Sequence, residues 1–381
     1  MKPPTSSEPN PEPKPEPGPQ PDTDLSPSPS PSPSPSPSPD PEAGPGSTLT
    51  PNSLRTRIIA VAAAAALLAT VAVAYTLRAA ERAEPTAATS EFALDPGHLY
   101  FRSTEAGAGR VARISTPSGA GPQEPRGPRG PSCERFYAAA GTALCLQRRS
   151  GIPPKSYALV LDRQLREKRR IALTGIPNRA RVSASGRMLS WTMFATGDSY
   201  AGSSFSTRTS ILDTRTGYLI KNMEEIPLTL DGRRYHSPDV NYWGVTFAED
   251  DNRFYATVST KGKTYLVQGD MKKWAARTLR TNVECPSLSP DNTRIAFKKR
   301  VRKGTSDPWR LYVLDLRTMR EHSLAETRNV DDQAAWLDDD TLAYALPGAE
   351  GRKQDIWTAR ADGEGAPNLL VRGGTSPAEV R

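Results

Sequence analysis

The sequence predicts an all-β fold, a six-bladed β-propeller that follows one transmembrane helix and a disordered Pro-rich N-terminal arm. Three observations lead to this prediction. A hairpin pattern with a Pro/Asp/Asn turn recurs about six times, one segment of twenty residues has no charge, Pro or Gly, and 18 of the 37 prolines lie within residues 1–50. We therefore expect an arm (1–57), a helix (58–77), a linker (78–93), a propeller (94–371) and a C-terminal tail (372–381).

The hairpin pattern is clearest at 288–299, LSPDNTRIAFKK, where Pro and Asp-Asn form a turn before an alternating strand. The same entry into a strand recurs six times at spacings of 45, 44, 66, 41 and 47 residues, and a period in the low forties is typical of a four-stranded propeller blade. The markers are His98, Ala143, Arg187, Arg253, Arg294 and Thr341. A second apolar strand follows each marker, at 110–116, 156–162, 208–217, 264–270, 310–318 and 355–363. No sustained helical period occurs between 94 and 371, which excludes an alternating β/α fold.

The arm alternates Ser and Pro without interruption from Ser26 to Pro39. Leu25 and Leu49 supply most of its apolar surface, so burial cannot offset the entropy of ordering it. We expect a disordered, largely polyproline-II spacer, with a Pro-rich ligand for a groove-bearing domain as the alternative.

The uncharged segment runs from Ile58 to Leu77. At about 1.5 Å per residue, a helix of this length spans roughly 30 Å, the thickness of a bilayer core. We predict a single-pass anchor in the cell membrane; a signal peptide cleaved after Ala72-Val73-Ala74 is the alternative. Two arginines flank each end, so the positive-inside rule gives no orientation. The short polar arm favours a cytoplasmic N-terminus and an extracytoplasmic propeller.

Charge is divided unevenly along the chain. The net charge is +8 overall and −5 in residues 1–50, which leaves +13 for the rest. A basic domain could bind nucleic acid, but a membrane anchor argues against that partner. Attraction to anionic envelope polymers or lipid head groups fits better, and an arginine-rich composition without a binding role is the plain alternative.

Three cysteines occur at 133, 145 and 285. An extracytoplasmic domain favours disulfides, and Cys133 and Cys145 are nearest in sequence. If Ala139 to Thr142 form the turn of a hairpin, however, Cys145 lies opposite Phe136 and about 10 Å from Cys133. On this register we do not predict a bridge.

The run Ser-Pro-Asp-Asn-x-x-Ile-Ala-Phe at 289–297, with Leu-Tyr-Val-Leu-Asp-Leu at 311–316, resembles the WD-related repeat of TolB-type six-bladed β-propellers. The same repeat occurs in the propeller domains of prolyl oligopeptidase relatives. The resemblance covers about 94–371, and the whole layout is similar to actinobacterial TolB-like membrane proteins. TolB has a separate α/β domain before its propeller, where this chain has the arm and the helix. TolB's partners in the Tol–Pal system are therefore not carried over.

Motifs for catalysis or metal binding are weak. The stretch nearest to a Gly-x-Ser-x-Gly nucleophile elbow, Gly197-Asp198-Ser199-Tyr200-Ala201, ends in Ala, and the ten residues after the last repeat leave no room for a hydrolase domain. The three histidines, His98, His236 and His322, lie in different blades without metal-ligand spacing. We expect no cofactor, no metal and no enzymatic activity.

One group of residues favours a binding site. The strand before each turn is the innermost of its blade, so its first residues line the mouth of the central channel. In two blades these residues are polar or aromatic, as is typical of ligand sites: Asp239, Asn241, Tyr242 and Trp243, and Asn329, Asp331, Asp332 and Gln333. The alternative is that they cap strand ends and satisfy backbone donors.

We therefore expect a monomeric propeller that binds a protein or another ligand at the cell envelope. The partner is an unknown envelope protein or an anionic polymer. The competing function class is a propeller enzyme of the lactonase or lyase type, whose catalytic groups would converge on the channel from distant blades.

Overall fold

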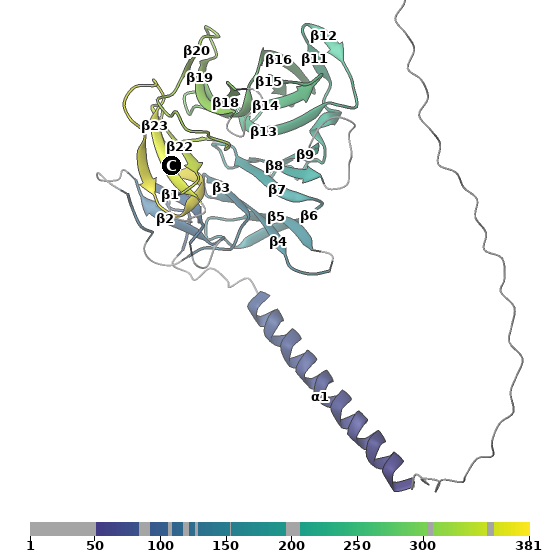
Figure 1. Ribbon diagram of the computed structural model, residues 1–381. Coiled ribbons are helices and arrows are strands. Elements are labelled where there is room, and N and C mark those ends of the chain that lie inside the picture. The colour runs from purple at the N-terminus through teal and green to yellow at the C-terminus, as the bar shows by residue number, and fades with distance from the viewer. Residues whose placement is uncertain are drawn as a thin grey trace, which may run out of the picture. The chain divides into compact units, whose positions relative to one another are not determined.

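The computed structural model describes residues 51–83, 92–105, 109–116, 122–125, 129–152, 154–195, 206–302, 308–348 and 354–381. These residues form helix α1 (Pro51–Ala83) and a β-propeller, which are described separately (Figure 1). The disorder predicted for residues 1–50 lies outside the described residues.

Helix α1 contains one segment, Ile58–Tyr75, that is long and apolar enough to cross a membrane. Its side chains are exposed, and Ala and Leu, which favour helices, make up much of it. The helix is longer than predicted, because residues 51–57 and 78–83, assigned to the arm and the linker, are also helical. The predicted linker (78–93) is also too long at its C-terminal end, since Phe92 is buried in the propeller core.

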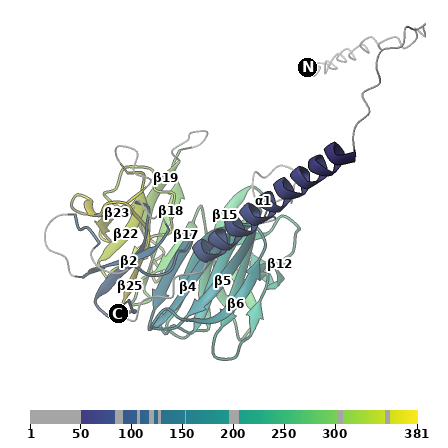
Figure 2. The ribbon, with the colours of Figure 1, turned by 90° about the horizontal axis from the view of Figure 1, so that it is seen from below.

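The propeller consists of six sheets (Figures 1 and 2). In chain order from the first marker, the sheets contain β1 (His98–Ser103), β2 (Val111–Ser115) and β25 (Gly374–Val380); β3 (Arg135–Ala139), β4 (Thr142–Arg149), β5 (Lys155–Leu161) and β6 (Glu167–Leu173); and β7 (Ile176–Val182), β8 (Met188–Ala195), β9 (Ser206–Asp213) and β10 (Leu219–Ile220). The fourth sheet contains β11 (Leu228–Leu230), β12 (Arg233–Tyr235), β13 (Asn241–Phe247), β14 (Arg253–Thr260), β15 (Lys263–Asp270) and β16 (Ala275–Thr281), after the short helix η1 (Met223–Glu225). The last two contain β17 (Glu284–Leu288), β18 (Arg294–Arg300), β19 (Trp309–Asp315) and β20 (Glu321–Ser323); and β21 (Ala335–Trp336), β22 (Thr341–Leu346), β23 (Asp355–Arg360) and β24 (Asn368–Val371).

The repeat predicted from the hairpin pattern is confirmed. Each of the six markers lies at or next to the start of the second strand of a sheet, β1, β4, β8, β14, β18 or β22. In the turn that defined the pattern, Asn292 takes the left-handed conformation, with φ of 60°, and its N–H donates to the Ser289 carbonyl at 2.9 Å. Asn tolerates this conformation better than most residues, which explains its place in the turn.

The ring is closed by the C-terminus, which the sequence did not predict. Residues 372–381 were expected to be a tail, yet β25 pairs antiparallel with β1, from His98 opposite Val380 to Ser103 opposite Gly374. This pairing makes β25 the inner strand of the first sheet, and it contacts β3 on one side and β21 on the other. The prediction was wrong because a propeller that closes in this way needs its last strand to complete the sheet of its first blade.

A disulfide joins Cys133 and Cys145, contrary to the prediction. The predicted register was correct, since Phe136 lies opposite Cys145 in the hairpin of β3 and β4. The chain bends at Glu134, however, and does not continue as an extended strand. The N–H of Cys133 donates to the Gly109 carbonyl at 2.7 Å, and the two cysteine Cα atoms are 5.4 Å apart. Cys285 is free and buried.

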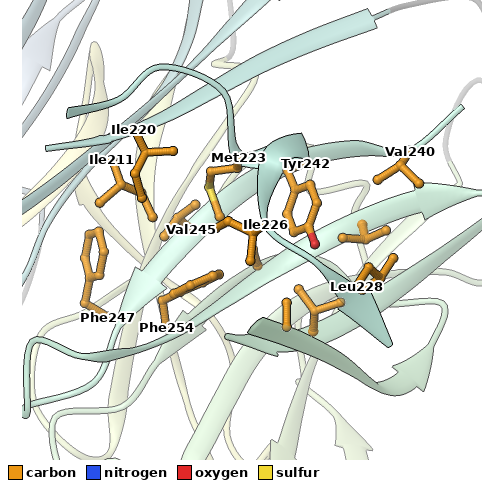
Figure 3. Close-up of a cluster of buried hydrophobic side chains, with 14 of the residues drawn as sticks. Ile211, Ile220, Met223, Ile226, Leu228, Val240, Tyr242, Val245, Phe247 and Phe254 are labelled. Atoms are coloured by element: carbon orange, nitrogen blue, oxygen red, sulfur yellow. The ribbon is translucent and has the colours of Figure 1, made fainter. Parts of the chain in front are cut away.

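Apolar side chains fill the spaces between neighbouring sheets. In the cluster shown in Figure 3, Ile211 and Ile220 from one sheet pack with Val245 and Phe254 from the next. Buried apolar residues lie on both faces of the sheets, as expected where a sheet is covered on both sides.

Ring closure can be tested by truncation. A chain that ends at Arg372 lacks β25 and leaves the inner edge of β1 unpaired, so we expect loss of the cooperative thermal transition that is followed by circular dichroism. A chain that ends at Val380 keeps the whole strand and is the control. Equally sharp melting of the two truncated proteins would contradict closure by β25.

Candidate functional site

A cavity of about 870 Å³ opens at the end of the channel where the inner strands begin. Inner strands of four sheets contribute to its wall, together with the loops between the outer strands. Its lining includes Arg135, Asn178, Arg179, Phe194, Trp243, Lys263, Glu284, Cys285, Lys298, Arg300, Trp309 and Asp331. The cavity thus combines aromatic rings with an excess of cationic side chains.

Trp243 reaches the cavity because β13 and β17 approach each other closely. The next residue, Gly244, has φ of 63°, and a Cβ atom at this position would lie 2.8 Å from the Cα of Cys285. Only glycine combines this conformation with this contact. The close approach leaves Trp243 with 5% of its surface exposed, at the wall of the cavity.

Lys298 is the centre of an ion cluster on the same wall, in which Lys298 and Glu284 are buried and Asp331 is exposed. Its ammonium group pairs with the Asp331 carboxylate and lies 3.7 Å from that of Glu284. Burial opposes ionisation of Asp331, but the charge and hydrogen bond of Lys298 outweigh it and lower its pKa. Burial raises the pKa of Glu284, and the charge of Lys298 offsets this effect only in part. The cluster keeps both carboxyl groups close to a single cation.

Two cationic side chains lie over the ring of Trp309. The Lys298 ammonium lies 4.1 Å and the Arg300 guanidinium carbon 4.2 Å from the ring centroid. Cation–π contacts of this length place positive charge beside an apolar surface at the mouth of the cavity. Such a surface suits a ligand that offers both an anionic and an apolar group.

Arg135 and Arg179 line both the cavity and a second, smaller space of about 20 Å³, which Asp332 also lines. The part of the cavity that adjoins this smaller space is called its floor. Burial lowers the pKa of Arg135, and the positive charge of Arg179 lowers it further. Burial also disfavours the charged form of Arg179, but Cys285 and Asp332 outweigh this effect and raise its pKa. The two guanidinium groups are therefore close enough to repel each other.

The site residues predicted from the sequence are divided between the cavity and the surrounding structure. Trp243 and Asp331 line the cavity together, although they come from different sheets. Asp239 caps the hairpin of β14 and β15, where it accepts hydrogen bonds at 2.7 Å from the Thr260 hydroxyl and from the Lys261 N–H. Burial opposes the ionisation of Asp239, but these bonds and one from Ser237 outweigh it and lower its pKa.

Three further candidates connect or cap strands. Asn241 accepts a hydrogen bond at 3.1 Å from the Thr207 N–H of the neighbouring sheet. Gln333 donates to the carbonyls of Pro286 at 2.8 Å and Val245 at 3.3 Å, so it joins three inner segments. Asn329 accepts from the Trp309 N–H at 2.8 Å. These contacts match the alternative reading, in which polar residues satisfy backbone groups.

Tyr242 lies in the core and outside the cavity. Its side chain is 1% exposed and packs beside Met223 and Ile226, away from the channel (Figure 3). Burial raises the pKa of its hydroxyl, for which no described residue is a hydrogen-bond partner. Successive residues of a strand point to opposite faces, so Tyr242 and Trp243 cannot both face the channel.

The basic residues of the cavity were missed from the sequence. Arg135, Arg179 and Glu284 lie in inner strands, as Trp243 does, so the rule that selected Trp243 also applies to them. A charged residue in an otherwise apolar inner strand was the available signal. Lys298, Arg300 and Trp309 come from the second and third strands of the fifth sheet, and only the folded ring brings them to the mouth.

Other sequence candidates give little further chemistry. The stretch Gly197–Ala201 lies outside the described residues. Within the described residues, no group of three or more His, Cys, Asp or Glu side chains gathers closely enough to hold a metal ion. His322 packs in the fifth sheet, where a ring nitrogen lies 2.8 Å from the Ala361 carbonyl.

A scan of known protein families and a search of curated proteins find no match to this chain. Among solved structures, TolB from Acinetobacter baumannii is 16% identical, with a TM-score of 0.52 over 75% of this chain and 67% of that chain. The fold is a TolB-like six-bladed β-propeller. At this level of identity the likeness to TolB concerns the fold alone.

Two further solved structures are less similar. A puromycin-hydrolysing peptidase of Mycobacterium tuberculosis is 13% identical, with a TM-score of 0.43 over 70% of this chain and 42% of that chain. A chain of a nidogen–laminin complex is 12% identical, with a TM-score of 0.45 over 74% of this chain and 97% of that chain. Neither score reaches 0.5, and neither likeness contributes to the argument below.

The assignment of Tyr242 to the core can be tested by Tyr242→Phe. The change removes a buried hydroxyl without a described partner, so we expect the free energy of unfolding to stay the same or to rise by up to about 1 kcal/mol. Urea unfolding measures this difference. A loss of more than about 1 kcal/mol would show that the hydroxyl has a stabilising partner.

Proposed function

We propose that this TolB-like propeller is a membrane-anchored, non-catalytic binding module of the cell envelope. In this proposal, Ile58–Tyr75 spans the membrane, the arm is cytoplasmic and the propeller is extracytoplasmic. The observation that carries the binding role is the cavity of about 870 Å³, whose wall combines two tryptophans with an excess of cationic side chains.

The location is supported by the helix and the disulfide. The apolar segment is long enough for a bilayer core, and a disulfide between Cys133 and Cys145 is typical of oxidising compartments outside the cytoplasm. The large basic propeller would then meet the anionic polymers and proteins of the envelope. Its charge favours an acidic partner and a rapid association that salt slows.

The binding role is supported by the chemistry of the cavity wall. Two of its carboxyl groups, those of Glu284 and Asp331, are engaged by Lys298, and its Cys285 thiol is buried. Trp243 and Trp309 offer apolar area at low entropic cost, which is typical of residues that dominate binding. A partner with an acidic segment and an apolar side chain would therefore fit this mouth.

Trp243→Ala tests the cavity as the binding site. Loss of an aromatic anchor in a pocket costs about 2 kcal/mol or more, so we expect capture of the native partner to weaken roughly thirtyfold. The measurement is quantitative pull-down of the detergent-solubilised full chain from its own membranes. Because Trp243 is only 5% exposed, its truncation should also lower the melting temperature, so capture is measured at a temperature at which the variant is folded.

Trp357→Ala is the matched control, since Trp357 does not line the cavity and stacks under Arg328, 3.8 Å from its ring centroid. Equal capture by wild type and by Trp243→Ala/Asp331→Ala would remove the cavity from the proposal. Turnover of a lactone or a glycan by the purified protein would instead support the enzyme class.

Protease accessibility tests the orientation. Protease added to intact spheroplasts should digest the propeller and spare a tag on the N-terminal arm, because the arm is expected inside. A cytoplasmic protein that stays intact is the control for the membrane seal. Protection of the propeller would reverse the orientation, and a soluble secreted product would identify Ile58–Tyr75 as part of a cleaved signal.

A further inference from the structure

Two arginines at the floor of the cavity have no anionic partner in contact. Arg135 is the first residue of β3, and Arg179 lies within the neighbouring inner strand β7. Both residues line the cavity. Among the described residues, neither forms an ion pair, and the Nε atom of each is buried without a hydrogen-bond partner. A buried guanidinium donor without an acceptor is unfavourable, because it has lost water and gained nothing in return.

Neighbouring groups hold these side chains in place without neutralising them. Arg179 donates from Nη1 to the Asn178 side-chain oxygen at 2.7 Å, which orients its guanidinium group. Arg179 also interacts with the Cys285 side chain. Asp332, whose Oδ2 atom is buried without a hydrogen-bond partner among the described residues, lines the smaller space beside both arginines and not the main cavity. The other carboxyl groups of this wall, Glu284 and Asp331, are paired with Lys298.

We infer that Arg135 and Arg179 form an oxyanion subsite at the floor of the cavity, which takes a carboxylate or phosphate group of the ligand. Guanidinium groups bind both anions through paired N–H donors, and two adjacent guanidinium groups can share one anion. The bound anion would neutralise positive charge and so reduce the repulsion between the two arginines. The inference deepens the proposed function and names the group that the ligand presents.

The position of the subsite gives the ligand a direction. The anion would lie at the floor, with the tryptophans Trp243 and Trp309 on the wall nearer the mouth. A ligand with an anionic group at one end and an apolar group beside it therefore fits better than a uniformly charged polymer. Burial and then the charge of Arg179 lower the pKa of Arg135, and a bound anion would oppose both effects.

Simple anions test the subsite without knowledge of the partner. We expect millimolar phosphate or acetate to protect the propeller against thermal unfolding, with a higher melting temperature than chloride gives at equal ionic strength. The experiment uses the full chain in detergent, and the stronger of the two anions identifies the ligand as a phosphate or a carboxylate.

The variant Arg135→Gln/Arg179→Gln should lose this rise in melting temperature. Arg233→Gln/Arg234→Gln is the matched control, since these two exposed arginines of β12 do not line the cavity. If the first variant does not fold, the comparison of phosphate, acetate and chloride on the wild-type protein still tests whether the subsite binds an anion. Protection no better than chloride, or equal protection in the folded double variant, would overturn the subsite.

This result is separate from the test of the proposed function. Loss of anion protection together with intact, Trp243-dependent partner capture would reject the subsite and leave the binding module. Anion protection without Trp243-dependent partner capture would support the subsite and reject the cavity as the binding site of the partner.

Discussion

The antiparallel pairing of β25 with β1 is the contact on which the rest of the propeller depends. It joins residues at the two ends of the described ring, His98 and Val380, and gives the first sheet its inner strand. Without it, β1 would present an unpaired edge to the channel, and β3 and β21 would lose the strand that lies between them. The channel wall, and therefore the cavity, exists only while this non-local pair is formed.

Once the ring is closed, polar groups hold neighbouring sheets in register at both ends of the channel. The turns between first and second strands are linked from one sheet to the next: Ser185 donates to Asp251 at 2.8 Å, the Glu249 N–H donates to Asn292 at 2.9 Å, and the Asp291 N–H donates to Asp339 at 3.1 Å. The Asp and Asn residues that make these turns thus also join the sheets. At the other end, Gln333 joins three inner segments with one amide.

The same geometry explains the electrostatics of the cavity. Inner strands converge, so side chains at their beginnings are brought together from different sheets and lose water. Lys298 forms ion pairs with Glu284 and Asp331, whereas Arg135 and Arg179 form no ion pair among the described residues. Arg179 interacts instead with the Cys285 side chain, and the charge of Asp332 acts on both arginines. Apolar packing between the sheets fixes these positions, since buried side chains such as Tyr242 and Phe254 leave little room for adjustment. The apolar packing therefore lies between the sheets, and the charged groups of the cavity lie at their inner edge.

The sequence by itself determined the parts that depend on local chemistry. The Pro/Asp/Asn turns and the alternating strands beside Arg294, Arg253 and Arg187 predicted six hairpins correctly, and the run from Ile58 predicted a long apolar helix. It also placed Trp243 and Asp331 near the channel, because an inner strand can be recognised by its position before the turn. It could not tell that Tyr242 is core, that 374–380 is a strand of the first sheet, or that Cys133 reaches Cys145. Each of these depends on a bend or a pairing between residues that are distant in sequence or on which face of a sheet is covered. Such contacts are decided when the ring closes, and only the tertiary structure shows them.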